Sequence, residues 1–322
     1  MNKFIKISLG LLISLFFLFI TFRSFQFHSL YETVQHVQYK WILPGLGIYF
    51  VAYILRSLRW SLLLSPLEFV HPVLLLPIIF FGFFLNTILP ARAGEFARAV
   101  TLSKNSNIPA SSCLGSIAIE RLTDLIGLLT LILLSSHLFP AGRLSPWKTI
   151  TAVAIGFSIV GFLLFLFQKK GEELEKKYTG LLAKLIQLCR KLTRGFTALK
   201  SPVKMATVAM ISILLWLTET SALMIISNAF QLNLTFLQSA AVIIGLAVGV
   251  MIPAAPGYVG TFEFFGQQIL VMLGFPPDSS LAFIVVFHFF QMIFITIAGL
   301  LSFLALSLAN RDKTLVPEPQ TT

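Results

Sequence analysis

Charged residues inside apolar runs are the part of this sequence most able to do chemistry. Glu120, Arg121 and Asp124 all lie in the run 113–139. On a helix Glu120 and Asp124 share a face, and Arg121 lies three positions before Asp124, so these two can pair. Because an ionised side chain within a membrane span costs about 3 kcal/mol, the three charges need partners. They predict a polar cavity, with a structural ion pair between helices as the alternative.

A second charged group follows a break in the chain at Pro90 and Gly94. Arg92, Glu95 and Arg98 lie where a helix is expected to restart near Glu95. A helix N-terminus together with two arginines suits a phosphate group. The alternative is a cytoplasmic loop whose basic residues only follow the positive-inside rule.

Two further acids lie in the second half of the chain. Glu219 falls within the run 205–230, and Glu263 follows a second break that contains Pro256, Gly257 and Gly260. Each acid is expected to pair with an arginine or to carry a proton, with a protonated, hydrogen-bonded structural role as the alternative. By contrast, Arg56 and Arg59 in the run 42–64 are best explained by snorkelling toward the head groups, with a role in substrate binding as the alternative.

The sequence carries no motif of a metalloenzyme or a nucleotide-binding enzyme. Its five histidines are scattered without the H-x-x-x-H spacing, and there is no G-x-S-x-G, Walker A or Rossmann pattern. We therefore expect no catalytic residue, no metal and no cofactor. A lipid head-group transferase that uses Glu120 and Asp124 as acid, base or metal ligands remains a rival, although Arg121 beside them argues against a cation site.

Composition then identifies the class of protein. Of the 322 residues, 57% are hydrophobic and 11% are charged, and the mean hydropathy is +0.88. A soluble domain has about a quarter charged residues, so soluble proteins, nucleic-acid binders and disordered chains are excluded. Two cysteines do not make a disulfide scaffold. Runs of about 20 apolar residues match the helix length that crosses ~30 Å of hydrocarbon. The chain is predicted to be an all-α polytopic membrane protein.

The positive-inside rule orients the predicted spans. Lys3 and Lys6 place the N-terminus in the cytoplasm, as an uncleaved first helix. The segment 169–204 has ten Lys or Arg and three Glu, so it should be cytoplasmic too. The segment 169–204 can be cytoplasmic only if the short run 73–89 enters and leaves the membrane on the cytoplasmic side. About six full spans are then expected, over 4–22, 42–64, 113–139, 149–167, 205–230 and 281–308.

The second half contains a matching pair of short runs. Runs 237–252 and 262–273 flank the second break and are expected to form a hairpin entered from outside, which leaves the C-terminus cytoplasmic. The two breaks resemble each other: Ile88-Leu89-Pro90-Ala91 before Glu95, and Met251-Ile252-Pro253-Ala254 before Glu263. Paired, Pro/Gly-broken segments are typical of transporters with inverted repeats. Simple short helices joined by loops are the alternative.

The basic segment has one apolar stripe. Over 174–199 its apolar residues recur every three or four positions, and the lysines and arginines lie largely off that stripe. This predicts an amphipathic helix on the anionic lipids of the inner leaflet, with a cytoplasmic linker helix as an equal alternative. One integral membrane domain is expected over 1–309, followed by a disordered tail over 310–322.

The motifs together resemble a known family. The strings are Leu89-Pro90-Ala91-Arg92-Ala93-Gly94-Glu95-Phe96-Ala97-Arg98, then Glu120-Arg121-Leu122-Thr123-Asp124, then Pro256-Gly257-Tyr258-Val259-Gly260-Thr261-Phe262-Glu263. They are similar to the flippase-like membrane domain of lysylphosphatidylglycerol synthases, over roughly residues 5–308. The soluble aminoacyltransferase domain of the full synthases has no counterpart in this chain, so aminoacylation is not implied.

The resemblance implies a protein of the cytoplasmic membrane that moves an anionic or head-group-modified phospholipid or glycolipid between leaflets. The positions that match the family's motifs are Arg92, Glu95, Arg98, Glu120, Arg121, Asp124 and Glu263. Our hypothesis is that Arg92 and Arg98, together with Arg121, hold the phosphate. Glu120, Asp124 and Glu263 would hold the arginines or receive a cationic substituent. Two rivals remain, namely the head-group transferase and a non-transporting partner of a lipid-modifying enzyme. No nucleic acid is expected as a partner.

Overall fold

Every regular element in the described part of the chain is a helix. The computed structural model describes residues 3–23, 31, 34–90, 92–138, 201–252 and 254–315. The predicted all-α class is therefore confirmed. The predicted span 149–167 and the amphipathic stretch 174–199 lie outside these residues, as does all but the last part of the basic segment 169–204.

Three described helices are long and apolar enough to cross a membrane. They cover Tyr39–Leu64, Pro202–Ala229 and Pro277–Leu308, and they contain α3 (Ile42–Leu64), α9 (Pro202–Ala229) and most of α12 (Pro277–Leu315). Two more helices have the length for a span: α1 (Lys3–Phe22) has 20 residues, and α6 (Ala110–Ser135) has 26 but carries three charges. The total of six spans stays a prediction.

Helix α12 is described through Asn310 to Leu315, into the segment 310–322 for which the sequence predicts a disordered tail. No glycine or proline interrupts this stretch before Pro317. Residues 316–322 lie outside the described part.

Contacts between loops define two ends of the helical body. At one end, which we call the Lys204 end, Lys204 Nζ donates to Ser65 Oγ at 2.8 Å, and Asn107 N donates to Glu68 Oε2 at 2.9 Å. At the other, the Gln38 end, Gln38 N donates to the Ala229 carbonyl at 2.9 Å. The ring of Phe230 also lies 5.1 Å from that of Phe283, near the start of α12, at this end.

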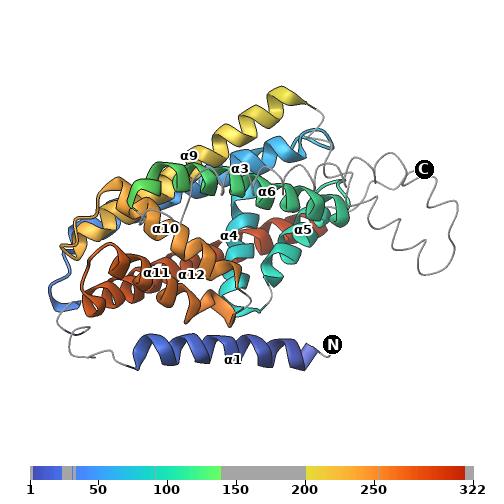
Figure 1. Cartoon of the computed structure of the whole chain (residues 1–322). Helices are drawn as coiled ribbons and strands as arrows, with labels where there is room; N and C mark the ends of the chain where they lie inside the picture. Colours follow the sequence, from blue (N-terminus) through green and yellow to red (C-terminus); the bar gives the residue numbers. More distant parts are fainter. Residues whose placement is uncertain are drawn as a thin grey trace, which may run out of the picture.

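Two helical hairpins start from these opposite ends. Helices α4 (Pro72–Ile88) and α5 (Ala93–Asn105) form the first, which opens at the Lys204 end. Helices α10 (Phe236–Met251) and α11 (Thr261–Met272) form the second, which opens at the Gln38 end. A short turn of helix, η4 (Pro256–Tyr258), lies in the second connection. Both hairpins can be followed in Figure 1.

The tips of the two hairpins meet inside the molecule. Arg92, in the first connection, donates from Nη2 to the carbonyl oxygen of Val250 near the end of α10, at 2.9 Å. A Cβ placed on Gly257 in the second connection would lie 3.6 Å from the Thr87 carbonyl oxygen. The helix packing therefore contains two hairpins that open at opposite ends and meet at their tips. That they are re-entrant stays a prediction.

Glycines allow the helices of each hairpin to approach closely. The amide of Gly94 donates to Asn86 Oδ1 at 2.8 Å, and a Cβ on Gly94 would collide with the carbonyl oxygen of Gly82 in α4. In the second hairpin a Cβ on Gly249 would lie 2.7 Å from the Thr261 carbonyl oxygen, again too close for a side chain. The two hairpins thus share a packing device as well as a sequence resemblance.

Helix α1 lies along α11 at the edge of the body (Figure 1). Phe17 packs against Phe264 with ring centroids 5.0 Å apart, and the amide of Ala255 donates to Ser14 Oγ at 2.7 Å. Phe16 and Phe19 on the other face are exposed. In a membrane protein such a face suits contact with lipid chains.

The buried apolar residues form two main clusters. One joins α9, α10 and α12 around residues such as Leu223 and Phe283, and the other joins α3, α4 and α5 around Trp60 and Leu75. The cavity described next lies where these two halves of the core meet.

Candidate functional site

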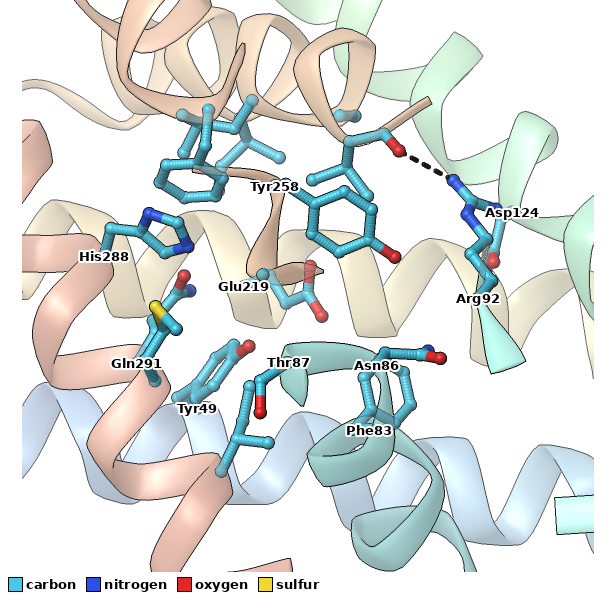
Figure 2. Close-up of a pocket in the computed structure, with 18 of the residues that line it drawn as sticks. Tyr49, Phe83, Asn86, Thr87, Arg92, Asp124, Glu219, Tyr258, His288 and Gln291 are labelled. Atoms are coloured by element: carbon cyan, nitrogen blue, oxygen red, sulfur yellow. Dashed lines mark hydrogen bonds between the residues drawn. The ribbon is translucent and has the colours of Figure 1, made fainter. Parts of the chain in front are cut away.

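A cavity of about 200 Å³, lined by charged, polar and apolar residues, lies between the hairpin tips. By the same measure one water needs ~10–15 Å³, so the space accommodates a polar group much larger than a few waters. Figure 2 shows charged, amide and aromatic side chains directed into it from several helices. Its polar lining residues are Tyr49, Arg56, Asn86, Thr87, Arg92, Glu95, Arg121, Asp124, Glu219, Tyr258, His288 and Gln291.

A chain of ion pairs forms one side of the cavity. Arg121 contacts Asp124 at 3.1 Å and Glu95 at 3.0 Å. The pair between Arg121 and Asp124, expected from their spacing on one helix, is confirmed. Glu95 also approaches Arg92 at 3.9 Å, which is a loose contact. Glu95 thus lies between two guanidinium groups that come from different helices.

Arg92 and Arg121 are the arginines most open to the cavity. Their side chains are 33% and 34% exposed. Arg92 precedes α5 with a left-handed backbone (φ 54°, ψ 39°), which is uncommon for a residue with a side chain and costs of order 1–3 kcal/mol. This conformation and the bond to Val250 direct its guanidinium into the space between the tips. Two cations therefore present hydrogen-bond donors to the same space.

The two arginines of α3 are paired rather than snorkelling. Arg59 is 1% exposed and donates to Asp124 Oδ1 at 2.7 Å and to Ser212 Oγ at 2.9 Å. Arg56 pairs with Glu219 of α9, and both line the cavity. The snorkelling interpretation is therefore wrong for these residues, because acids on α6 and α9 provide partners inside the protein. The expectation that Glu219 pairs with an arginine is confirmed.

Arg98 and Glu120 form a buried pair away from the cavity. Their side chains are each 3% exposed and contact at 3.0 Å, and the Arg98 guanidinium lies 4.2 Å from the centroid of the Trp60 ring. Neither residue lines the cavity. For Glu120 the structural alternative, an ion pair between helices, therefore holds, whereas Asp124 and Arg121 on the same helix do face the cavity.

Glu263 orders the second connection. Its Oε2 accepts from the Gly260 amide at 2.6 Å, and its Oε1 lies 2.6 Å from His288 Nδ1. Pro256 begins η4, and Gly257 and Gly260 have positive φ angles of 70° and 96°. Of these loop residues only Gly257 lines the cavity. The expectation that Glu263 holds an arginine is wrong, because its two oxygens bind the loop backbone and the histidine.

Several lining residues other than arginines and carboxylates were missing from the sequence prediction. They are Tyr49, Asn86, Thr87, Tyr258, His288 and Gln291. A signal existed for two of them, because His288 and Gln291 are the only polar residues between Leu281 and Ile295 and lie three apart. That spacing places both on one face of a helix. The others follow only from the meeting of the two tips.

The charged residues that line the cavity balance. Arg56, Arg92 and Arg121 are matched there by Glu95, Asp124 and Glu219. Behind the lining, the buried Arg59 beside Asp124 is offset by Glu263 beside His288. Within the described residues, no group of three His, Cys, Asp or Glu side chains has the arrangement to hold a metal ion. The partly exposed guanidiniums of Arg92 and Arg121 are the groups that can bind an anion directly.

Comparison with known proteins agrees with this architecture. The family described as Lysylphosphatidylglycerol synthase TM region matches residues 7–299. A UPF0104 membrane protein of Methanocaldococcus jannaschii is 23% identical over 225 residues, which cover 68% of this chain and 93% of that protein. No solved structure matches the chain significantly. The chain is thus a membrane protein that belongs to the family of lysylphosphatidylglycerol synthase transmembrane regions.

Proposed function

We propose that this protein moves a lipid with an anionic, phosphate-containing head group between the two leaflets of the membrane. The observation that carries the proposal is the pair of partly exposed guanidiniums, Arg92 and Arg121, in one polar cavity between opposed hairpin tips. Arginine binds phosphate through parallel hydrogen bonds, and such bonds are strongest where water is scarce. Membership of the family supports a lipid-related role.

The position of the cavity supports transport rather than surface binding. Arg56, Asp124 and Glu219 are far from the ends of α3, α6 and α9. Charged residues at such depth are costly and mark substrate pathways. Non-helical backbone at membrane depth is tolerated where it lines a cavity, as both hairpin connections do here. We infer that the two hairpins are re-entrant and that the cavity lies near the middle of the bilayer.

Glu95 allows the arginines to exchange a carboxylate partner for a phosphate group and back. This carboxylate already contacts Arg121 at 3.0 Å and approaches Arg92 at 3.9 Å. An incoming phosphate competes with it for both guanidiniums and displaces it most easily from Arg92, where the contact is loose. When the lipid leaves, Glu95 neutralises the arginines again. A bound anion is thereby held without being trapped, as transport requires.

We further propose the orientation that the charges favour. The Lys204 end is cytoplasmic, the Gln38 end faces outward, and both termini are cytoplasmic in the cytoplasmic membrane. In this account the protein does no covalent chemistry on the lipid, and its acyl chains stay in the bilayer while the head group crosses through the cavity.

The test is transbilayer movement of head-group-labelled phosphatidic acid and phosphatidylglycerol in proteoliposomes. Wild type is compared with Arg92→Ala and with Lys104→Ala, which removes a charge from an exposed position of the same helix. We expect movement with wild type and Lys104→Ala, and at least a tenfold slower rate with folded Arg92→Ala. No movement with the wild-type protein, or equal rates for all three proteins, would contradict the proposal.

A further inference from the structure

We propose that the head group carries, beyond its phosphate, a neutral group with several hydroxyls, such as a polyol or a sugar, and not a cationic amine. This inference rests on the proposed function and concerns the other end of the same cavity. It comes from the contrast between the two ends in Figure 2. Arg92 and Asp124 lie on one side, His288 and Gln291 on the other, and Glu219 between them.

The far end offers hydrogen-bonding groups other than arginines and carboxylates. Gln291 makes no hydrogen bond to any other described residue, so its whole amide is available to a ligand. His288 uses Nδ1 on Glu263, which leaves Nε2 for the cavity. The Thr87 hydroxyl donates to the Phe84 carbonyl at 2.7 Å, so its oxygen can accept. The far end therefore offers both hydrogen-bond donors and hydrogen-bond acceptors. A hydroxyl group can use both, because it donates one hydrogen bond and accepts others.

The middle of the cavity adds further side chains that can hydrogen-bond to hydroxyl groups. Asn86 accepts the Gly94 amide through Oδ1, which leaves its NH₂ group as a donor. The hydroxyl of Tyr49 lies 3.3 Å from that of Tyr53 and keeps further capacity to donate or accept. The rings of Tyr49, Tyr258 and Phe262 also line the cavity. Apolar faces with a few polar groups between them are the usual surroundings of an oriented small group.

The carboxylates argue against a cationic amine. Glu219 is paired with Arg56, and Glu263 with His288. Asp124 binds both Arg59 and Arg121, and Glu95 binds Arg121. The far end of the cavity therefore presents no unpaired carboxylate in the described part of the chain. Glu95, which an incoming phosphate displaces, lies at the arginine end. An ammonium group at that end would lie beside the guanidiniums of Arg92 and Arg121, whose like charge opposes it.

The test compares four lipids with identical acyl chains, each added to the purified full chain in detergent. They are phosphatidic acid, phosphatidylglycerol, phosphatidylinositol and phosphatidylethanolamine, and the dissociation constant of each is measured by thermal-shift titration. We expect phosphatidylinositol to bind tightest, about tenfold tighter than phosphatidic acid, as one or two additional net hydrogen bonds would give. Phosphatidylethanolamine should bind no tighter than phosphatidic acid.

Variants then separate the two ends of the cavity. Gln291→Leu and Tyr49→Phe should remove most of the preference for phosphatidylinositol and leave phosphatidic acid binding within about twofold. Arg92→Ala should weaken all three anionic lipids, and Thr207→Val, which removes a hydroxyl outside the cavity, should change none.

The possible results give separate answers on the two proposals. Equal binding of the three anionic lipids, or tightest binding of phosphatidylethanolamine, would overturn the inference and leave the proposed function standing if Arg92→Ala still weakens binding. A preference that survives both Gln291→Leu and Tyr49→Phe would also overturn it. No binding of any anionic lipid would contradict the proposed function itself, and this inference with it.

Discussion

At the scale of residues, burial divides the charged side chains into two groups. Arg59, Arg98 and Glu120 are almost fully buried and paired, so they hold helices together. Arg92 and Arg121 are about one-third exposed and contact the cavity. The first group should therefore affect stability, and the second should affect lipid binding.

The buried pair of Arg98 and Glu120 gives a direct test of this division. Glu120→Ala leaves the Arg98 guanidinium buried without its partner, which typically costs about 3–5 kcal/mol of unfolding free energy. Replacing both residues by leucine removes both charges and should cost less than the single change. Thermal unfolding in detergent measures both. If the double variant is the less stable protein, the pair does not have this role.

At Glu95, by contrast, a substitution is expected to strengthen lipid binding. Glu95→Gln removes the carboxylate that competes for Arg92 and Arg121, so phosphatidic acid should bind several-fold more tightly. Because release then slows, its movement across the membrane should slow as well. A titration gives the dissociation constant and proteoliposomes give the rate. Weaker binding would show that Glu95 serves the anion in some other way.

The sequence predicted which types of charged residue form the site better than it predicted which of them form ion pairs. Spacing along one helix was sufficient for Arg121 and Asp124, which do pair. The pairs of Arg59 with Asp124 and of Arg98 with Glu120 join different helices. Helical spacing carries no information on contacts between helices, and for that reason Glu120 was assigned to the cavity and the arginines of α3 to the head groups.

At the scale of elements, the two hairpins position the site. The first was expected from the short run 73–89 and a helix that restarts near Glu95, and the second from the pair of short runs 237–252 and 262–273. The structure confirms the helices on both sides of each break. Their tip-to-tip contact through Arg92 and Val250 depends on tertiary packing and was not foreseen. It brings Tyr258 and Thr87 into one cavity.

Gly94 is the position where this packing is most easily disturbed. Gly94→Ala introduces a methyl group against the Gly82 carbonyl and should cost about 1–3 kcal/mol, because α4 and α5 must separate. The matched control is Gly47→Ala in α3, where a Cβ meets nothing within 4 Å. That change should be neutral or stabilising by up to ~1 kcal/mol. Equal losses of thermal stability in both variants would contradict the proposed contact.

At the scale of the whole molecule, amino-acid composition was sufficient to identify the class of protein. Such a fraction of apolar residues admits only a membrane protein, and the family match agrees. The orientation was inferred from charge, and the structure adds that loops 65–68 and 106–109 adjoin at one end.

Cysteine labelling tests that orientation. In a chain whose two native cysteines are replaced by alanine, a cysteine at Glu68 or Lys104 should react with an impermeant reagent only from the cytoplasmic side. One at Lys40 or Asp278, at the Gln38 end, should react only from outside. The two positions that flank the first hairpin must agree with each other. Labelling of Glu68→Cys and Lys104→Cys from opposite sides would rule out a hairpin that returns to its own side.

The most direct measurement of the central claim is where the lipid head group lies. Phosphatidic acid with a short photoreactive group on its phosphate is cross-linked to the protein in proteoliposomes, and the modified residues are mapped by mass spectrometry. We expect cross-links at the hairpin tips, over residues 86–95 and 254–262, and a strong decrease with Arg92→Ala but not with Lys104→Ala. Cross-links confined to lipid-facing positions such as Phe16 and Phe19, unchanged by Arg92→Ala, would contradict a path through the cavity.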